Sequence, residues 1–453
     1  MPALPDPVSE RLAQRLAQAQ RTSRLPSVVA GLVRDGELVW QGAAGQVDGR
    51  PPDARTQYRI GSITKTLVGM SVLRLAEQGR VDLDDRVTDH VPDAPVGRAT
   101  VLQLLAQAAG LRAETAGPWW ERAPGGDWDD LLGRLEQPTA PLGAGRRHHY
   151  SNVGYAVLGR LLELAHGCRW DEVLAKDWFG PLGLADTTVR PRPPFAPGLA
   201  VHPFADAVLA EPEHDAGAMA PAGQLWMTLP DLARWAAFLG GDGDGLLSPD
   251  TLDAARRPVS IDDRPGQPWT SAYGLGVQVF ADAKGRRSFG HGGSMPGFLA
   301  LLRVDADTRD AVVVATNTTA GLDLELSRDL LALLHEHAPK PAPAWEPGGV
   351  DRAALALAGI WYWGPTPVSV TATGDGRLEM KPVQGPARAS RFVRQDDGTW
   401  LGLDGYYAGE VLRVRYDDEA EVNHLDLASF VFTRTPYDPG AGVPGGVDPD
   451  GWR

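Results

Sequence analysis

A serine and a lysine three residues apart, Ser62 and Lys65, form the pair in this chain that could do chemistry without help from other segments. The segment after them, residues 66–79, is apolar and ends on Gly79, which suits a left-handed helix cap. Because positions i and i+3 share a helix face, the amine can reach the hydroxyl. A desolvated lysine could accept the serine proton, and the free N–H groups and dipole at a helix start would stabilise an oxyanion. The alternative is a helix-capping serine beside a solvated lysine.

A second candidate is the loop that carries Tyr150, Ser151 and Asn152 immediately before another apolar segment. A phenol there could pass a proton to a leaving group, and the Asn152 amide could bind a substrate carbonyl or steady Lys65. Taken alone, these residues fit better a tyrosine that anchors a loop and an asparagine that caps a helix.

The third candidate is a glycine-rich run, residues 288–298, which contains His291, Gly293 and Ser294. Glycines inside a strand often mark the close approach of a ligand or of another backbone. His291 could then donate a hydrogen bond to substrate, and the N–H of Ser294 could complete an oxyanion hole. A glycine-rich bulge with an incidental histidine fits this run equally well.

These residues need a scaffold, and the apolar pattern predicts an α+β domain. We expect an opening amphipathic helix over residues 7–22 and a hairpin over Val28–Gln41 that turns at Asp35–Gly36. The pattern over about residues 99–240 predicts mostly helices joined by long Gly/Pro-rich loops. Strands return later, and the early and late strands are expected to share one sheet with the central helices packed around it. The late elements are strands at 273–280, 287–291, 298–304 and 311–317 and a helix at 324–337.

The predicted first domain spans residues 1–338, and a Pro/Gly-rich linker follows over residues 339–350. Beyond the linker, residues 351–453 contain short alternating runs separated by turns such as Gly374-Asp-Gly376. This pattern of short alternating runs predicts a small antiparallel β-barrel or sandwich.

Composition limits the classes of function. The chain has 453 residues, 43% of them hydrophobic, and a net charge of −14, which argues against nucleic acid and anionic membranes as partners. The single cysteine, Cys168, excludes an intramolecular disulfide. We expect no secretory signal and no membrane-spanning segment, and therefore a cytoplasmic protein.

Taken in order, Ser62-x-x-Lys65, Tyr150-x-Asn152 and His291-x-Gly293 resemble the motif set of the serine β-lactamase and penicillin-binding protein superfamily. The similarity is greatest to the class C β-lactamase-like branch, with its DD-peptidases, D-aminopeptidases and esterases, over about residues 10–335. It implies a β-lactamase/transpeptidase-like fold with an antiparallel sheet, flanking helices and a helical subdomain. The C-terminal domain resembles the lipocalin-like barrels attached to D-aminopeptidases.

The resemblance implies a role for each matching residue. Ser62 would be the acylated nucleophile, Lys65 its proton acceptor, and Tyr150 the partner base and then acid. Asn152 would position Lys65 and the substrate amide. The implied substrate-binding strand contains His291 in place of a motif lysine, Gly293 at the strand edge, and Ser294, whose N–H pairs with that of Ser62 in the oxyanion hole.

Two departures from the family pattern bear on the substrate. A neutral His291 in place of a fixed cation weakens recognition of the carboxylate that β-lactams and cell-wall peptides present. Gln107 lies in a run, Leu104 to Leu111, where relatives usually carry a His-Thr-Ser-Gly-like sequence, so the pocket wall and its substrate contacts differ.

The sequence therefore predicts a cofactor-free, metal-free serine hydrolase of a small-molecule or short peptide substrate, most similar to an esterase or a D-aminopeptidase. The alternatives are a β-lactamase or DD-carboxypeptidase and, from another class, a catalytically silent binding module. Assembly of a homo-oligomer through the C-terminal domain is a further expectation.

Overall fold

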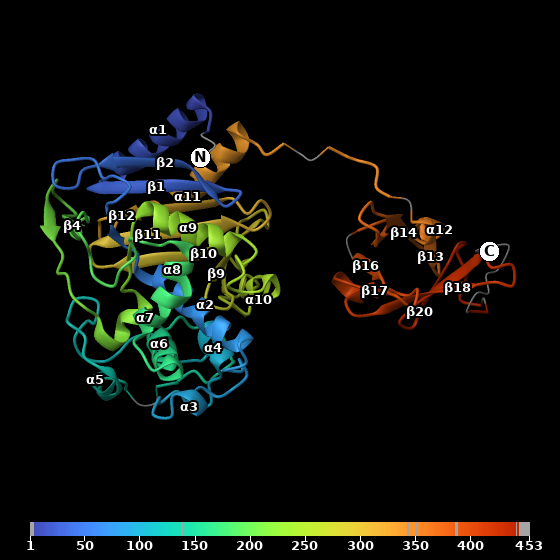
Figure 1. The fold of residues 1–453 in the computed structure, drawn as a ribbon, viewed down its shortest axis with the longest axis horizontal. Coiled ribbons are helices and arrows are strands. Elements are labelled where there is room, and N and C mark those ends of the chain that lie inside the picture. Colours follow the sequence, from blue (N-terminus) through green and yellow to red (C-terminus); the bar gives the residue numbers. More distant parts are fainter. Residues whose placement is uncertain are drawn as a thin grey trace. The chain divides into compact units, whose positions relative to one another are not determined.

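The structure is a computed structural model that describes residues 4–136, 139–341, 344–349, 351–385, 388–440 and 442–443. The chain separates into two compact units, Met1–Lys340 and Pro341–Arg453, shown in Figure 1. The first unit carries all the candidate catalytic residues.

An eight-stranded antiparallel sheet forms the frame of the first unit. Its strand order is β2-β1-β12-β11-β10-β9-β8-β7, so strands from both ends of the unit lie side by side, as the sequence predicted. The strands are β1 (Ser27–Arg34), β2 (Glu37–Gly45), β7 (Ser260–Ile261), β8 (Ser271–Tyr273), β9 (Gln278–Ala281), β10 (Arg287–Met295), β11 (Phe298–Asp305) and β12 (Ala311–Thr316).

Strand β1 is buried on both faces, because helices cover both sides of the sheet. Its residues alternate between two cores, with Val28 and Ala30 in one and Val29 and Val33 in the other. The smaller core contains α1 (Asp6–Thr22) and α11 (Glu325–His337), which lie side by side in Figure 1. The larger core contains α2 (Thr64–Glu77), α9 (Leu229–Gly240) and the helical subdomain.

The helical subdomain packs around α2 and α6 (Asn152–His166), the two helices that follow Ser62 and Tyr150. Its other helical elements are α3 (Val87–His90), α4 (Val101–Leu105), α5 (Trp128–Gly133), α7 (Trp170–Leu174), η2 (Ala175–Phe179), α8 (Gly180–Leu182), η3 (Gly217–Ala222) and α10 (Pro249–Ala255). Two small ribbons complete the unit: β3 (Tyr58–Arg59) with β6 (Trp226–Met227), and β4 (Leu199–Val201) with β5 (Val208–Ala210).

Two sequence predictions are wrong in detail, and the first is the strand at residues 273–280, which do not form a single strand. The chain breaks between β8 and β9, where Gly276 has a φ of +85° and its N–H donates to the Leu105 carbonyl. A Cβ on Gly69 of α2 would lie 2.7 Å from the Gly276 Cα, so the break lets two backbones meet. Similarly, Ser62 does not begin an α-helix but lies in a 3₁₀ turn, η1 (Gly61–Ile63), that leads into α2.

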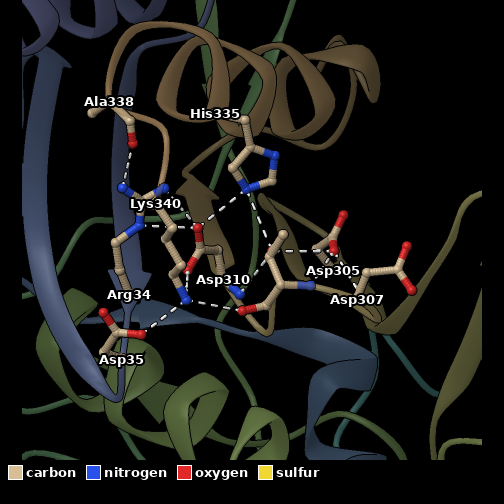
Figure 2. A network of polar contacts seen from close by, with 9 residues as sticks. Arg34, Asp35, Asp305, Asp307, Asp310, His335, Ala338 and Lys340 are labelled. Atoms are coloured by element: carbon tan, nitrogen blue, oxygen red, sulfur yellow. Dashed lines mark hydrogen bonds and ion pairs between the residues drawn. The ribbon is translucent and has the colours of Figure 1, made fainter. Parts of the chain in front are cut away.

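A buried carboxylate fastens the end of the first unit to its first hairpin (Figure 2). Asp310, whose side chain is fully buried, accepts hydrogen bonds from Arg34 at 2.8 and 3.0 Å and contacts His335 at 3.1 Å. Lys340 bridges Asp310 (3.0 Å) and Asp35 (2.8 Å). Together these basic groups lower the pKa of the Asp310 carboxyl to about 2, although its burial acts in the opposite direction.

The second unit is a closed antiparallel barrel of eight strands, which confirms the predicted fold class. Helix α12 (Arg352–Leu357) precedes it, and the Trp361 indole donates to the Leu357 carbonyl at 2.7 Å. The barrel elements are β13 (Gly359–Trp363), β14 (Thr366–Ala372), β15 (Arg377–Pro382), β16 (Ser390–Arg394), β17 (Trp400–Gly402), η4 (Gly405–Tyr407), β18 (Val411–Tyr416), β19 (Val422–Leu427) and β20 (Phe430–Thr433).

Candidate active site

The turn that carries Ser62 packs directly against strand β10. A Cβ on Gly61, whose φ is +54°, would lie 2.5 Å from the Ser294 nitrogen, and one on Gly293 would lie 2.0 Å from the Ile60 carbonyl oxygen. Only glycine permits this approach of two backbones. The turn and the strand therefore place Ser62 and Ser294 together in the lining of one cleft.

Lys65 lies one turn into α2, where its side chain is fully buried. Its Nζ donates to the Ser62 Oγ at 2.9 Å, the contact that the helical spacing predicts, and to the Ala222 carbonyl oxygen at 2.6 Å. Burial lowers the pKa of the Lys65 ammonium to about 7, against the opposing influence of the Glu114 and Glu121 carboxylates. Lys65 is thus able to accept a proton from Ser62 near neutral pH.

Tyr150 lines the same cleft as Ser62 and belongs to the loop before α6. Its ring centroid lies 5.0 Å from the Lys65 Nζ. Burial of the phenol and the nearby Tyr273 raise the pKa of Tyr150 well above its usual value. The phenol therefore carries its proton at neutral pH, which suits it to protonate a leaving group rather than to act first as a base.

Asn152 is the first residue of α6, and its amide donates to the Glu114 carboxylate at 2.6 Å. The expected influence of Asn152 on Lys65 is therefore indirect, because Glu114 raises the Lys65 pKa. Glu114 also accepts from the Trp120 indole at 2.7 Å.

His291 lines the cleft, but the structure gives it a different role from the expected substrate donor. Its Nδ1 lies 2.5 Å from the Gly292 carbonyl oxygen, which can only accept, so Nδ1 carries a proton. Its Nε2 lies 2.9 Å from the Tyr273 hydroxyl. Burial and the Lys65 charge lower the pKa of His291 to about 3, so the ring is neutral and Nε2 accepts from Tyr273. Both ring nitrogens are thus used within the protein.

Gln107 forms hydrogen bonds with the residues on either side of Tyr150. Its side-chain Oε1 accepts from the Ser151 N–H at 2.8 Å, its Nε2 donates to the Ser151 carbonyl at 3.3 Å, and its own carbonyl accepts from the His149 N–H at 2.8 Å. A backbone φ of +55° accompanies these contacts. The structure therefore places Gln107 as a support for the loop, whereas the sequence suggested a substrate contact.

The cleft itself has a volume of about 380 Å³ and combines the motif residues with an apolar wall. It is lined by Ser62, Glu121, Tyr150, Asn152, Gln278, His291, Gly292, Gly293, Ser294, Leu299, Ala300, Leu301, Leu322 and Leu324. Sequence reasoning missed Glu121 and Gln278.

Glu121 is a half-buried carboxylate in this lining. It accepts from the Trp119 indole at 2.8 Å, and burial raises its pKa. It lies in a long loop, where no periodicity could indicate which way a side chain faces.

No group of three or more His, Cys, Asp or Glu side chains within the described ranges is placed to hold a metal ion. Within the same ranges, none of the helices combines the length and the apolar character needed to cross a membrane.

Comparison with known proteins gives two family matches. A model described as β-lactamase matches residues 12–337, and one described as a domain of unknown function (DUF7586) matches residues 350–434. A D-aminopeptidase of Cereibacter sphaeroides is 28% identical over 406 residues, which cover 84% of this chain and 74% of that protein.

Solved structures share the fold. A D-stereospecific amidohydrolase from Streptomyces sp. matches with a TM-score of 0.61 and 27% identity, over 74% of this chain and 100% of that one. The octameric penicillin-binding protein homologue from Pyrococcus abyssi matches with a TM-score of 0.65 and 19% identity, over 94% of this chain and 99% of its own.

Proposed function

Given that this chain belongs to the β-lactamase family, we propose that it hydrolyses small amides and esters of amino acids with a free ammonium group, through an acyl-enzyme on Ser62. Family membership confirms the resemblance seen in the motifs and makes the chain a serine hydrolase. The choice of substrate within that class is the part that we propose.

The proposed reaction begins when neutral Lys65 takes the Ser62 proton and Oγ attacks the substrate carbonyl carbon. The N–H groups of Ser62 and Ser294 stabilise the oxyanion. The Tyr150 phenol then donates its proton to the leaving amine or alcohol, the bond to that group breaks, and the Lys65 ammonium restores the Tyr150 proton. Water then attacks the acyl-enzyme ester and gives a proton to the Lys65–Tyr150 pair. The bond between the acyl carbon and the Ser62 Oγ breaks, the pair returns a proton to Oγ, and the acid leaves.

The observation that carries the choice of substrate is the Glu121 carboxylate, in a cleft whose lining, among the residues that the structure describes, includes no lysine or arginine. A half-buried carboxylate favours a cationic group such as a substrate ammonium. It disfavours the carboxylate of a β-lactam, and neutral His291 supplies no compensating charge. The similarity to a D-aminopeptidase and to a D-stereospecific amidohydrolase supports the same choice.

A substrate panel tests this proposal. It comprises D- and L-phenylalanine amides, their N-acetyl derivatives, p-nitrophenyl esters and a chromogenic cephalosporin. N-acetylation removes the cation and is expected to lower kcat/KM about tenfold or more, the value of one charge-assisted contact. Glu121→Gln should remove most of that difference, whereas Glu37→Gln, an exposed control on β2, should not. Efficient turnover of the cephalosporin alone would contradict the proposal.

We propose in addition that copies of the chain assemble through the C-terminal barrel. The octameric state of the Pyrococcus abyssi homologue supports this idea by analogy of fold. Light scattering from the full chain tests it, and a monomer at micromolar concentration would count against it.

A further inference from the structure

Strand β10 loses one neighbour partway along its length. Strand β9 pairs with it only from Arg287 to Gly290, and the register ends at the pair Gly290–Gln278. Beyond this pair the chain before β9 turns away at Gly276 toward α2. From His291 onward, β10 therefore has an edge that faces the cleft and could in principle pair with an extended substrate.

Two side chains occupy the backbone hydrogen-bonding groups of Gly292 on this edge. The Gln278 Oε1 accepts from the Gly292 N–H at 3.1 Å, and the His291 Nδ1 donates to the Gly292 carbonyl at 2.5 Å. In a strand, the N–H and the carbonyl of one residue face the same neighbour, so both groups that an added strand would use are occupied. The Tyr273 hydroxyl, 2.9 Å from the His291 Nε2, fixes the ring that makes the second contact.

The closed part of the edge lies on the leaving-group side of the scissile bond. In the proposed reaction the leaving group faces Tyr150, which protonates it. The Tyr150 and His291 ring centroids are 6.1 Å apart, so a group that faces Tyr150 lies toward the His291–Gly292 end of β10. A peptide leaving group would need to pair along that end, whereas ammonia or a small alcohol would not.

We propose that Gln278 is a specificity-determining residue that, together with His291, restricts the leaving group to a small one. The preferred substrates are then primary amides and simple esters of amino acids rather than peptides extended beyond the scissile bond. This inference rests on the proposed function, because it assumes acyl transfer to Ser62 with Tyr150 as the proton donor.

The test compares two substrates with the same acyl group, phenylalanine amide and phenylalanyl-glycyl-glycine, in the enantiomer that the wild type hydrolyses faster. The wild type is expected to favour the amide. Gln278→Ala should reduce that preference about fivefold, the effect of one backbone hydrogen bond, through a lower KM for the tripeptide and an unchanged kcat for the amide. Gln278→Glu keeps an acceptor and should keep the preference, as should Gln41→Ala, an exposed strand control.

A wild-type enzyme that cleaves both substrates equally well, or a preference that Gln278→Ala leaves unchanged, would overturn the inference. A loss of kcat on both substrates would also overturn it, because it would mean a merely structural role. If circular dichroism shows that Gln278→Ala does not fold, Gln278→Met retains the side-chain length without the acceptor and serves instead.

An ester series separates this inference from the proposed function. The series compares the phenylalanine methyl ester with an ester whose alcohol is extended by two glycine units. If neither amide is hydrolysed but the esters are, the amide function fails while the effect of Gln278→Ala on the ester ratio still decides the role of Gln278.

Discussion

The pKa of Lys65 makes the proton-acceptor role of this residue measurable. A shift from 10.5 to about 7 corresponds to about 5 kcal/mol of preference for the neutral amine. With that pKa, about a tenth of the molecules hold a neutral Lys65 at pH 6, about half at pH 7 and about nine tenths at pH 8. The rate of Ser62 acylation should therefore rise through neutral pH and become constant above about pH 8.

The assay is the second-order rate constant for labelling by an uncharged fluorophosphonate between pH 5 and 10. Such a reagent does not titrate, and in the cleft His291 has a pKa lowered to about 3 while that of Tyr150 is raised. Burial raises the pKa of the Glu121 carboxyl in the same lining, so Glu121→Gln serves as a control. A midpoint that persists in this variant, moved to lower pH because Glu121 stabilises the ammonium, belongs to Lys65. Glu114→Gln should move the midpoint to lower pH, because this carboxylate stabilises the ammonium. A rate that rises tenfold per pH unit up to pH 9 would refute the reasoning, since it would indicate an ordinary lysine.

Three further variants test other parts of the account. Gly293→Ala places a Cβ 2.0 Å from a carbonyl oxygen and should lower the acylation rate about a hundredfold, whereas Gly133→Ala, with open space around it, should leave the rate unchanged. Lys65→Met should abolish acylation yet raise the melting temperature at pH 7. The pKa of the Lys65 amine is lowered in the folded state, so this amine destabilises the fold at any pH below its unfolded pKa of about 10.5. The gain in melting temperature should therefore shrink toward pH 10. Asp310→Asn should cost about 3 kcal/mol in urea unfolding at pH 7, since it removes the ion pair of Arg34, whose side chain is largely buried. The contribution of the carboxylate is present above about pH 4 and is lost as the pH falls toward 2. No change in stability for Asp310→Asn, or a lower melting temperature for Lys65→Met, would contradict these two expectations.

Local spacing was enough to predict the contact between Ser62 and Lys65, because both residues belong to one helical segment. The order of Tyr150 and His291 along the chain was informative only through the family motif. Nothing near His291 in the sequence indicates that the hydroxyl of Tyr273, on another strand, is hydrogen-bonded to its Nε2.

Long-range contacts account for the parts that the sequence did not predict. Ala222, whose carbonyl holds Lys65, is 157 residues away in sequence, and Glu121 and Gln278 enter the cleft from a loop and from a strand end. The break at Gly276 also required knowledge of α2, because the chain turns there to let two backbones pack. Patterns of period two or 3.6 report which face of an element is buried, not which distant backbone group a side chain will meet.

The central claim is that Ser62 is the nucleophile and Lys65 its base. Intact-protein mass spectrometry after brief exposure to a fluorophosphonate, followed by peptide mapping, tests it most directly. We expect one adduct on Ser62 in the wild type and none in Ser62→Ala or Lys65→Ala, with Lys176→Ala labelled at the wild-type rate. Folded wild-type protein that stays unlabelled, or that carries its adduct on another residue, would contradict it.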